Sequence, residues 1–225
     1  HGPLAWRDYG VAVEGNCVRL LEAAFEEAWE NWLTRKARWP NLRRSRWMAK
    51  FQRYFLINNG LRQRLRMNSQ LLSRMKSGKE KIWIAVPYFM PAVRTLKYLK
   101  DLARRGVDVR VVVPQHNDIL IMNWVMKYQY QEMLTSGIRV FEFGPGVMHA
   151  KVLLVDHWVT LGSSNLNSRS FFHDLEVNYV IQMASTRRQI EAEFRELYES
   201  SNEIRDPQYV TWHEKVLGKI FLTMR

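Results

Sequence analysis

The strongest constraint on the fold is a regular alternation of short apolar runs with longer amphipathic stretches, which begins near residue 60. Two of these runs, Ile82–Val86 and Val109–Val113, are almost entirely apolar, as in strands that are buried on both faces of a sheet. Parallel strands of that kind need a long crossover connection, usually a helix. The pattern therefore predicts the α/β class, with a mixed sheet flanked by helices on both faces.

The elements expected after residue 58 follow this alternation. Pro91 opens one helix, and Gly106 and Gly137 end two others, as their backbone preferences favour. Helices are expected over 61–77, 91–105, 119–135 and 185–202. Strands are expected over 81–86, 107–113, 138–143, 151–156, 158–161 and 175–182.

The first 35 residues have a different pattern. A short strand is expected over 11–14, and Asn16 can cap a helix that runs to about Arg35. The apolar residues of this helix recur at intervals of three and four. The helix is expected to expose an acidic face that consists of Glu22, Glu26, Glu27 and Glu30.

The segment 36–58 reverses the charge. Basic residues recur from Arg35 to Arg53 with no acidic residue between them, and tryptophan, phenylalanine and tyrosine are interleaved. We expect a loop, linker or insertion here. It is either a solvated basic face or an anion-binding surface with aromatic anchors, as at a membrane interface or a nucleic-acid groove.

The last segment, 206–225, is expected to form an amphipathic helix. Its apolar residues would share one side: Tyr209, Val210, Trp212, Val216, Leu217, Ile220, Phe221 and Met224. Packing onto the domain is the default interpretation, and a position in a membrane interface is the alternative. The sequence suggests no internal repeat.

The charge balance narrows the class of partner. The formal net charge of +12 and the pI of about 10.0 predict attraction to nucleic acid, anionic lipid or phosphate-rich substrates. Cys17 is the single cysteine, so no intrachain disulfide can form, in agreement with a reducing compartment. No apolar run approaches the roughly 20 residues that span a bilayer, and no signal peptide is visible. The first eight residues lead us to expect a fragment of a longer sequence.

Chemistry concentrates in the segment 148–172, MHAKVLLVDHWVTLGSSNLNSRSFF. His149 and Lys151 are two residues apart, so they project together if a strand begins at or just before His149. Ser163 and Asn165, brought close by the next strand, complete the outline of a phosphate site. The lysine supplies charge, and the serine and asparagine supply hydrogen bonds. The histidine can attack phosphorus or transfer a proton near neutral pH.

With Asp156 and the turn at Gly162, this pattern resembles the signature of the phospholipase D superfamily: His-x-Lys, four residues, Asp, and then a Gly-Ser-x-Asn turn. The chain has HAKVLLVD and GSSN. The gap between Asp156 and Gly162 is five residues where many members have six, which we interpret as a difference in hairpin length. The runs WRDYGVAVEG, WIAVPYFMP, ARRGVDVRVVVP and GSSNLNSRSFFHDLEVNYVI are similar to bacterial cardiolipin synthases.

The resemblance implies a phospholipase D-like fold and a set of site residues. The catalytic residues would be His149, Lys151 and Asp156, and the residues that support the substrate phosphate would be Ser163, Asn165 and Glu176. A glutamate after the second motif orients a catalytic histidine in cardiolipin synthases, and Glu176 matches it. The family needs no cofactor or metal, so Asp156 is expected to support the hairpin or a neighbouring base.

Three further residues are candidates for the lining of the pocket. Tyr88 and Phe89 follow the strand expected over 81–86. Asp118 lies just after the strand expected over 107–113, at a strand end where the sites of α/β proteins often gather.

The resemblance also implies that a second part is needed. Two-motif members join two His-Lys-Asp sets at one active site, whereas this chain holds one, and its WRD segment normally follows the first motif. Residues 1–58 would then be the end of a first half with a basic linker, 59–205 a second phospholipase D-like domain, and 206–225 the C-terminal helix. A missing half or a homodimer partner would complete the site. His149 is either nucleophile or acid/base, and the analogy favours proton donation to the leaving alcohol.

The function that the resemblance implies is phosphatidyl transfer between phospholipids through a phosphohistidine intermediate. The substrates would be anionic phospholipids, with phosphatidylglycerol favoured. The protein would lie peripherally on the cytoplasmic face of a bacterial inner membrane. Two alternatives stay open, a nuclease of the same superfamily that acts on nucleic acid and an inactive half-domain.

Overall fold

The computed structural model describes residues 6–34, 53–58, 60–167, 170, 174–206 and 210–223. Its helices are α1 (Asn16–Thr34), α3 (Leu61–Ser77), α4 (Val93–Arg104), α5 (Leu120–Leu134), α7 (Ala184–Glu199) and α8 (Trp212–Thr223). Its strands are β1 (Trp6–Arg7), β2 (Phe55–Ile57), β3 (Lys81–Ala85), β4 (Asp108–Pro114), β5 (Arg139–Phe143), β6 (Val147–Met148), β7 (Val152–Val155), β8 (Trp158–Gly162), β9 (Val177–Val180) and β10 (Ser201–Ile204).

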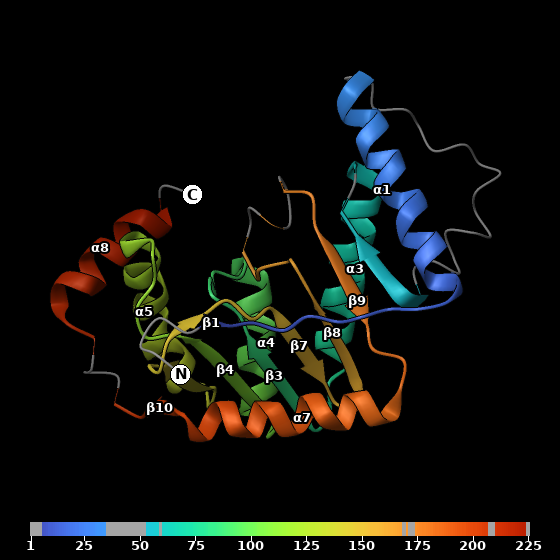
Figure 1. Cartoon of the computed structure of the whole chain (residues 1–225). Helices are drawn as coiled ribbons and strands as arrows, with labels where there is room; N and C mark the ends of the chain where they lie inside the picture. Colours follow the sequence, from blue (N-terminus) through green and yellow to red (C-terminus); the bar gives the residue numbers. More distant parts are fainter. Residues whose placement is uncertain are drawn as a thin grey trace.

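Eight of the described strands form one sheet in the order β10-β5-β4-β3-β7-β8-β9-β2 (Figure 1). Strands β3, β4 and β5 are parallel, and the remaining pairs are antiparallel. In the middle of the sheet, Ile84 pairs with Val111 on one side and with Leu153 on the other. The mixed sheet expected from the apolar runs is therefore confirmed.

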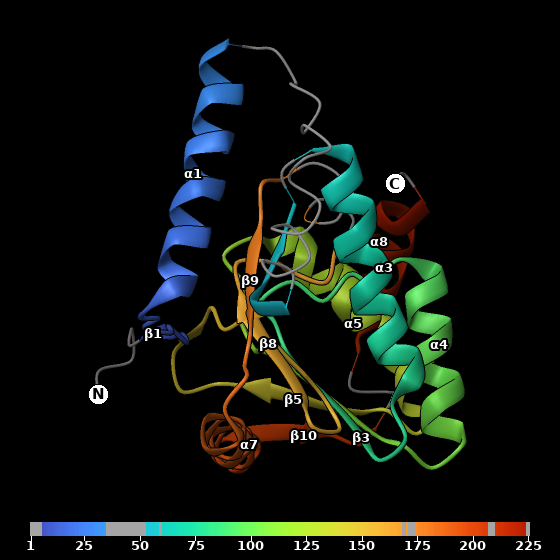
Figure 2. The ribbon, with the colours of Figure 1, turned by 90° about the vertical axis from the view of Figure 1, so that its right-hand side faces the viewer.

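Helices cover both faces of this sheet (Figure 2). Ile82 and Ile84 of β3 point into a core that they share with α3, α4 and α5. Trp83 and Ala85 point to the other face, where α7 packs with Phe194. This alternation follows from the two-residue period of a strand and accounts for the continuous apolar run of β3.

The two ends of the sheet differ from the sequence prediction. The expected strand over 11–14 is absent, and β1 lies before it at Trp6–Arg7. Phe55–Ile57, expected in a loop or linker, form β2 and pair with β9 at one edge. β10 forms the other edge, and its polar sequence gave no sign of a strand. Residues 35–52 of the basic segment lie outside the described residues.

Helix α8 packs against α5, as the default interpretation of the C-terminal segment predicts. The two helices approach so closely at Gly218 that a Cβ there would lie 2.4 Å from the backbone oxygen of Trp124. Tyr209 and Met224 lie outside the described residues. No described helix combines the length and apolar character that crossing a membrane requires.

Helix α1 projects beside the β9–β2 edge (Figures 1 and 2). It leaves apolar side chains in solvent. The exposed fractions of Phe25 and Trp29 are 65% and 53%, so the acidic residues are not its whole exposed face. The sequence of residues 21–30, LEAAFEEAWE, matches that of residues 190–199 in α7, IEAEFRELYE, at five of ten positions. We call this similarity the α1–α7 match; it is limited to ten residues.

The two segments of the α1–α7 match have opposite environments. In α7, Phe194 and Tyr198 are 2% and 8% exposed, because they pack on Trp83 and Phe141 of the sheet. The matching residues of α1 are the exposed Phe25 and Trp29. Helix α1 thus carries the apolar face of a sheet-covering helix without covering this sheet.

Candidate active site

His149 is held by the N-terminal segment of the chain. β1 pairs in parallel with β6, and the backbone N–H of His149 donates to the carbonyl oxygen of Arg7 at 2.9 Å. The Arg7 guanidinium in turn bonds Glu193 of α7 at 2.5 Å. Residues 149–151 connect β6 to β7 and are not a strand, so the strand on which a common direction of His149 and Lys151 depended is absent. Both residues nevertheless line the same groove.

The imidazole of His149 has a carboxylate partner. Its Nδ1 lies 2.9 Å from Oδ2 of Asp8, and the Trp6 ring meets it edge-on with the centroids 5.4 Å apart. An Nδ1–H donated to a carboxylate fixes the ring and leaves Nε2 for chemistry. The tautomer is assigned from this contact. Asp8 belongs to the WRD segment. The sequence analysis compared this segment with the end of a first half, but it predicted no contact between Asp8 and His149.

The ammonium group of Lys151 lies beside the same residue. Its Nζ donates to the carbonyl oxygen of His149 at 2.7 Å. Burial lowers the pKa of Lys151, while the nearby carboxylates of Asp8 and Glu176 act in the opposite direction. The structure thus brings an imidazole, a carboxylate and an ammonium group together.

Glu176 is paired with Ser163. The Ser163 hydroxyl donates to Oε2 of Glu176 at 2.5 Å, and the backbone N–H of Val177 donates to the Ser163 oxygen at 3.0 Å. Burial raises the pKa of Glu176, although its serine partners oppose that shift. Asp8, and not Glu176, is the carboxylate that contacts the His149 ring.

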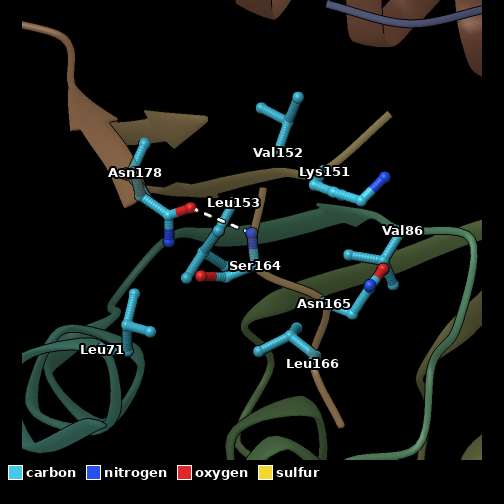
Figure 3. A pocket seen from close by; sticks show the side chains of 10 residues that line it. Leu71, Val86, Lys151, Val152, Leu153, Ser164, Asn165, Leu166 and Asn178 are labelled. Atoms are coloured by element: carbon cyan, nitrogen blue, oxygen red, sulfur yellow. Dashed lines mark hydrogen bonds between the residues drawn. The ribbon is translucent and has the colours of Figure 1, made fainter. Parts of the chain in front are cut away.

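The turn that carries Ser163 and Asn165 is fixed by close packing against β9. The backbone N–H of Ser164 donates to Oδ1 of Asn178 at 3.2 Å (Figure 3). A Cβ on Gly162 would lie 2.2 Å from the carbonyl oxygen of Val177, so glycine is required there. Lys151 and Asn165 line the same small cavity, in which Asn165 Oδ1 is buried without a protein partner (Figure 3).

Asp156 lies at the opposite end of β7 from Lys151. Five residues of extended chain correspond to about 16 Å, so the structure does not bring Asp156 to His149. Its carboxylate accepts backbone N–H groups of Lys79, Glu80 and Lys81 at 3.0, 2.9 and 3.0 Å. Burial opposes ionisation, but these bonds hold the pKa of Asp156 below its usual value. Its geometry is that of a residue that supports the hairpin.

The three pocket-lining candidates lie elsewhere. The Tyr88 hydroxyl donates to Oδ1 of Asp118 at 2.8 Å. Burial, together with this bond, raises the pKa of Tyr88 to about 12. Phe89 is 2% exposed and belongs to the hydrophobic core. None of the three lines the groove at His149.

His149 and Lys151 open onto a groove of about 370 Å³, which we call the His149 groove. Asp8 and Ser163 also line its polar end. Among the described residues, no cluster of histidine, cysteine, aspartate or glutamate has the arrangement of a metal site. The polar end combines cationic charge with a carboxylate-oriented imidazole, a set that can hold a phosphodiester and transfer a proton to or from it.

Comparison with known proteins agrees with this chemistry. Residues 71–198 match the family model described as "Cardiolipin synthase, PLD-like domain". The chain is 34% identical over 206 residues to the cardiolipin synthase of Alkalihalophilus pseudofirmus, an alignment that covers 88% of this chain and 40% of that protein. It is 32% identical over 221 residues to that of Halalkalibacterium halodurans, with 94% and 43% covered. The chain thus spans about two-fifths of the length of these relatives.

Solved structures show the same fold. Nuc from Salmonella typhimurium, a phospholipase D family member, superposes with a TM-score of 0.52 at 23% identity and covers 62% of this chain and 91% of its own. The phosphatidylserine synthase of Haemophilus influenzae superposes with a TM-score of 0.54 at 18% identity and covers 70% of this chain and 42% of its own. The fold expected for the domain is therefore confirmed.

Proposed function

Because the chain belongs to the phospholipase D-like domain family of cardiolipin synthases, we propose that it forms one part of a phosphatidyltransferase that makes cardiolipin from phosphatidylglycerol. The observation that carries the proposal is the contact of 2.9 Å between Asp8 and Nδ1 of His149, with the Lys151 ammonium beside it. This is the local arrangement that acid/base work on a phosphodiester needs.

In the proposed reaction His149 acts as the acid and then as the base. A second histidine attacks phosphorus, the P–N bond forms, and the P–O bond to the leaving glycerol breaks as His149 donates the Nε2 proton to that oxygen. The hydroxyl of another phosphatidylglycerol then attacks phosphorus, His149 takes the hydroxyl proton back, and the P–N bond breaks. Asp8 holds the ring through both steps, and Lys151 offsets the charge on the phosphate oxygens.

The second histidine would come from another phospholipase D-like half, and the α1–α7 match supports this. Asp8 lies 13 residues before the matched segment of α1 and Glu176 lies 14 residues before that of α7, and Asp8 already orients a histidine. Glu176 would orient the histidine of the other half. The exposed Phe25 and Trp29 would pack on the sheet of that half, as Phe194 and Tyr198 pack here. The sheet described here has helices on both faces, so a second copy of it would offer α1 no open face.

A peripheral position on the cytoplasmic face of the inner membrane completes the proposal. The net charge of +12 favours an anionic surface, where each basic residue contributes about 1 kcal/mol. Arg43, Arg44 and Arg46 lie outside the described residues but carry part of that charge. Reversing these three charges should weaken binding to vesicles that contain phosphatidylglycerol. Unchanged binding at low salt would contradict the membrane part of the proposal.

A product assay tests the reaction. Labelled phosphatidylglycerol and single-stranded DNA are offered in parallel to the chain and to a longer protein in which an upstream half is restored. The longer protein should form cardiolipin, His149→Ala should abolish the product, and the exposed His157→Ala should not. DNA cleavage that depends on His149 would replace the lipid proposal with a nuclease. Product that survives His149→Ala would refute the role of His149.

A further inference from the structure

The His149 groove has an apolar wall that the chemistry at phosphorus does not use. Beyond the polar end, the groove is lined by aliphatic and aromatic side chains from three separate parts of the chain. We call this set the apolar wall: Val11, Val13, Leu21, Phe55, Leu161 and Val177. The wall lies between the N-terminal segment and the β9–β2 edge of the sheet, directly next to His149.

The wall has a buried floor and an open rim. Phe55 and Leu161 are 2% and 5% exposed and form the floor, whereas Val11 and Val177 at the rim are 39% and 37% exposed. Apolar side chains at the mouth of a groove stay in contact with water until a ligand or partner covers them. The wall is therefore an unfilled apolar surface that continues from a charged phosphate site.

The composition of the wall selects among phosphodiesters. A nucleobase is recognised by stacking on open aromatic faces and by hydrogen bonds to its edges. The wall is mainly aliphatic, and Tyr9 and Tyr179 line the groove beside it. The aromatic rings already have partners: Phe55 is buried against Tyr179 with the ring centroids 5.3 Å apart, and the Arg7 guanidinium lies 5.4 Å from the centre of the Tyr9 ring. A groove of about 370 Å³ lies within the usual size range of small-molecule sites. An alkyl chain can bind such a surface through apolar contacts alone, because it has no groups that need a hydrogen-bond partner.

On the basis of the function proposed above, we propose that the apolar wall binds the first methylene groups of one acyl chain of the phospholipid whose phosphate lies at His149 and Lys151. The wall would then make substrate preference depend on the acyl chain of the phospholipid and not on its head group. Leu21, in the second turn of α1, and Val177, in β9, are the specificity-determining residues from the two sides of the groove.

A chain-length series tests the inference by calorimetric binding. The ligands are glycerophosphoglycerol, which has the phosphodiester without acyl chains, and dibutanoyl, dihexanoyl and dioctanoyl phosphatidylglycerol below their micelle concentrations. If one chain lies on the wall, the dissociation constant should fall about fourfold for each carbon added to the acyl chains, the factor that corresponds to about 0.8 kcal/mol per methylene. It should level off once the groove is filled.

Matched variants locate the effect. Leu21→Asp and Val177→Asp should each remove most of the chain-length dependence. A new carboxylate in the groove also repels an anionic phosphodiester, so the dependence is measured relative to glycerophosphoglycerol binding by the same variant. Val18→Asp places the same charge on the same helix at an exposed position outside the groove, and should behave as the wild type. Thermal melting of each variant shows whether it is folded.

The outcomes separate this inference from the function on which it rests. Binding of every ligand with equal affinity, weakened by Lys151→Ala, would overturn the acyl site and leave the phosphate site intact. A chain-length dependence that Val18→Asp reduces as much as Leu21→Asp would also overturn it. Binding of a dithymidine phosphodiester more tightly than dihexanoyl phosphatidylglycerol would overturn both the inference and the lipid function.

Discussion

Replacing Asp156 by alanine should destabilise the protein and leave the site at His149 intact. The carboxylate joins the β7–β8 hairpin to the turn between α3 and β3 by accepting three backbone N–H groups, those of Lys79, Glu80 and Lys81. Asp156 also has a φ of 51°, which aspartate and asparagine tolerate better than alanine does.

The size of the loss follows from which of these bonds water can replace. A hydrogen bond to a charged group contributes about 1.5–3 kcal/mol. Two of the three N–H groups are solvent-exposed, so screening and hydration reduce their share, and the bond from Lys81 is partly buried. We expect a total loss of about 2–3 kcal/mol. For a chain of this size that lowers the Tm by about 4–12 °C.

The dependence on pH gives a second test of Asp156. Because its pKa is depressed in the folded state, its contribution is fully present above the unfolded value of 3.8 and is lost as the pH falls through the folded value. The difference in unfolding free energy between wild type and Asp156→Asn should therefore be constant from about pH 5 to pH 8 and shrink below about pH 4. Urea unfolding at a series of pH values measures it.

Ligand binding by the Asp156→Ala protein tests whether Asp156 acts only in the hairpin. Glycerophosphoglycerol should bind the folded Asp156→Ala protein as it binds the wild type, because the carboxylate lies about 16 Å along the strand from Lys151. If the variant melts like the wild type and loses this binding, Asp156 acts in the phosphate site and not in the hairpin.

Three further substitutions test the geometry of the site and of the C-terminus. Asp8→Asn should lower cardiolipin formation by at least about tenfold with little change in Tm, and Asp118→Asn is the matched control; equal losses in both would refute the role of Asp8. Gly162→Ala should cost about 3 kcal/mol or more in urea unfolding, because its Cβ would lie 2.2 Å from a carbonyl oxygen of β9; an unchanged midpoint would refute the close packing. Gly218→Ala should loosen α8 from α5 by about 1–3 kcal/mol and speed proteolysis at the C-terminus, and equal proteolysis rates would contradict the close crossing.

Elements whose periodicity reflects burial could be predicted from the sequence. β3 and β4 are apolar because helices cover both faces of the sheet, and α3 was placed at its observed bounds from its spacing. β10 could not be predicted in this way, since it is a polar edge strand that directly follows α7. β1 and β6 are two residues long, too short for any period to appear.

The sequence indicated which residues gather at the candidate site, but not which of them contact one another. The motif located His149 and Lys151, but the strand geometry assumed for them does not occur. The orienting carboxylate was assigned to Glu176, whereas Asp8, 141 residues before His149, makes the contact. No local pattern can show a pairing across that distance. The α1–α7 match is present in the sequence, but the opposite environments of Phe25 and Phe194 become visible only in the structure.

The pairing of β1 with β6 limits how this protein can be divided and recombined. The segment 59–205 looks like a self-contained unit, because it holds nearly the whole sheet and the His-x-Lys pair. The His149 imidazole is nevertheless oriented by a side chain that lies outside the unit, at residue 8. A gene exchange or an engineered fusion that transfers 59–205 alone would carry this ring and leave its orienting group behind. The two segments are therefore expected to be inherited and transplanted together.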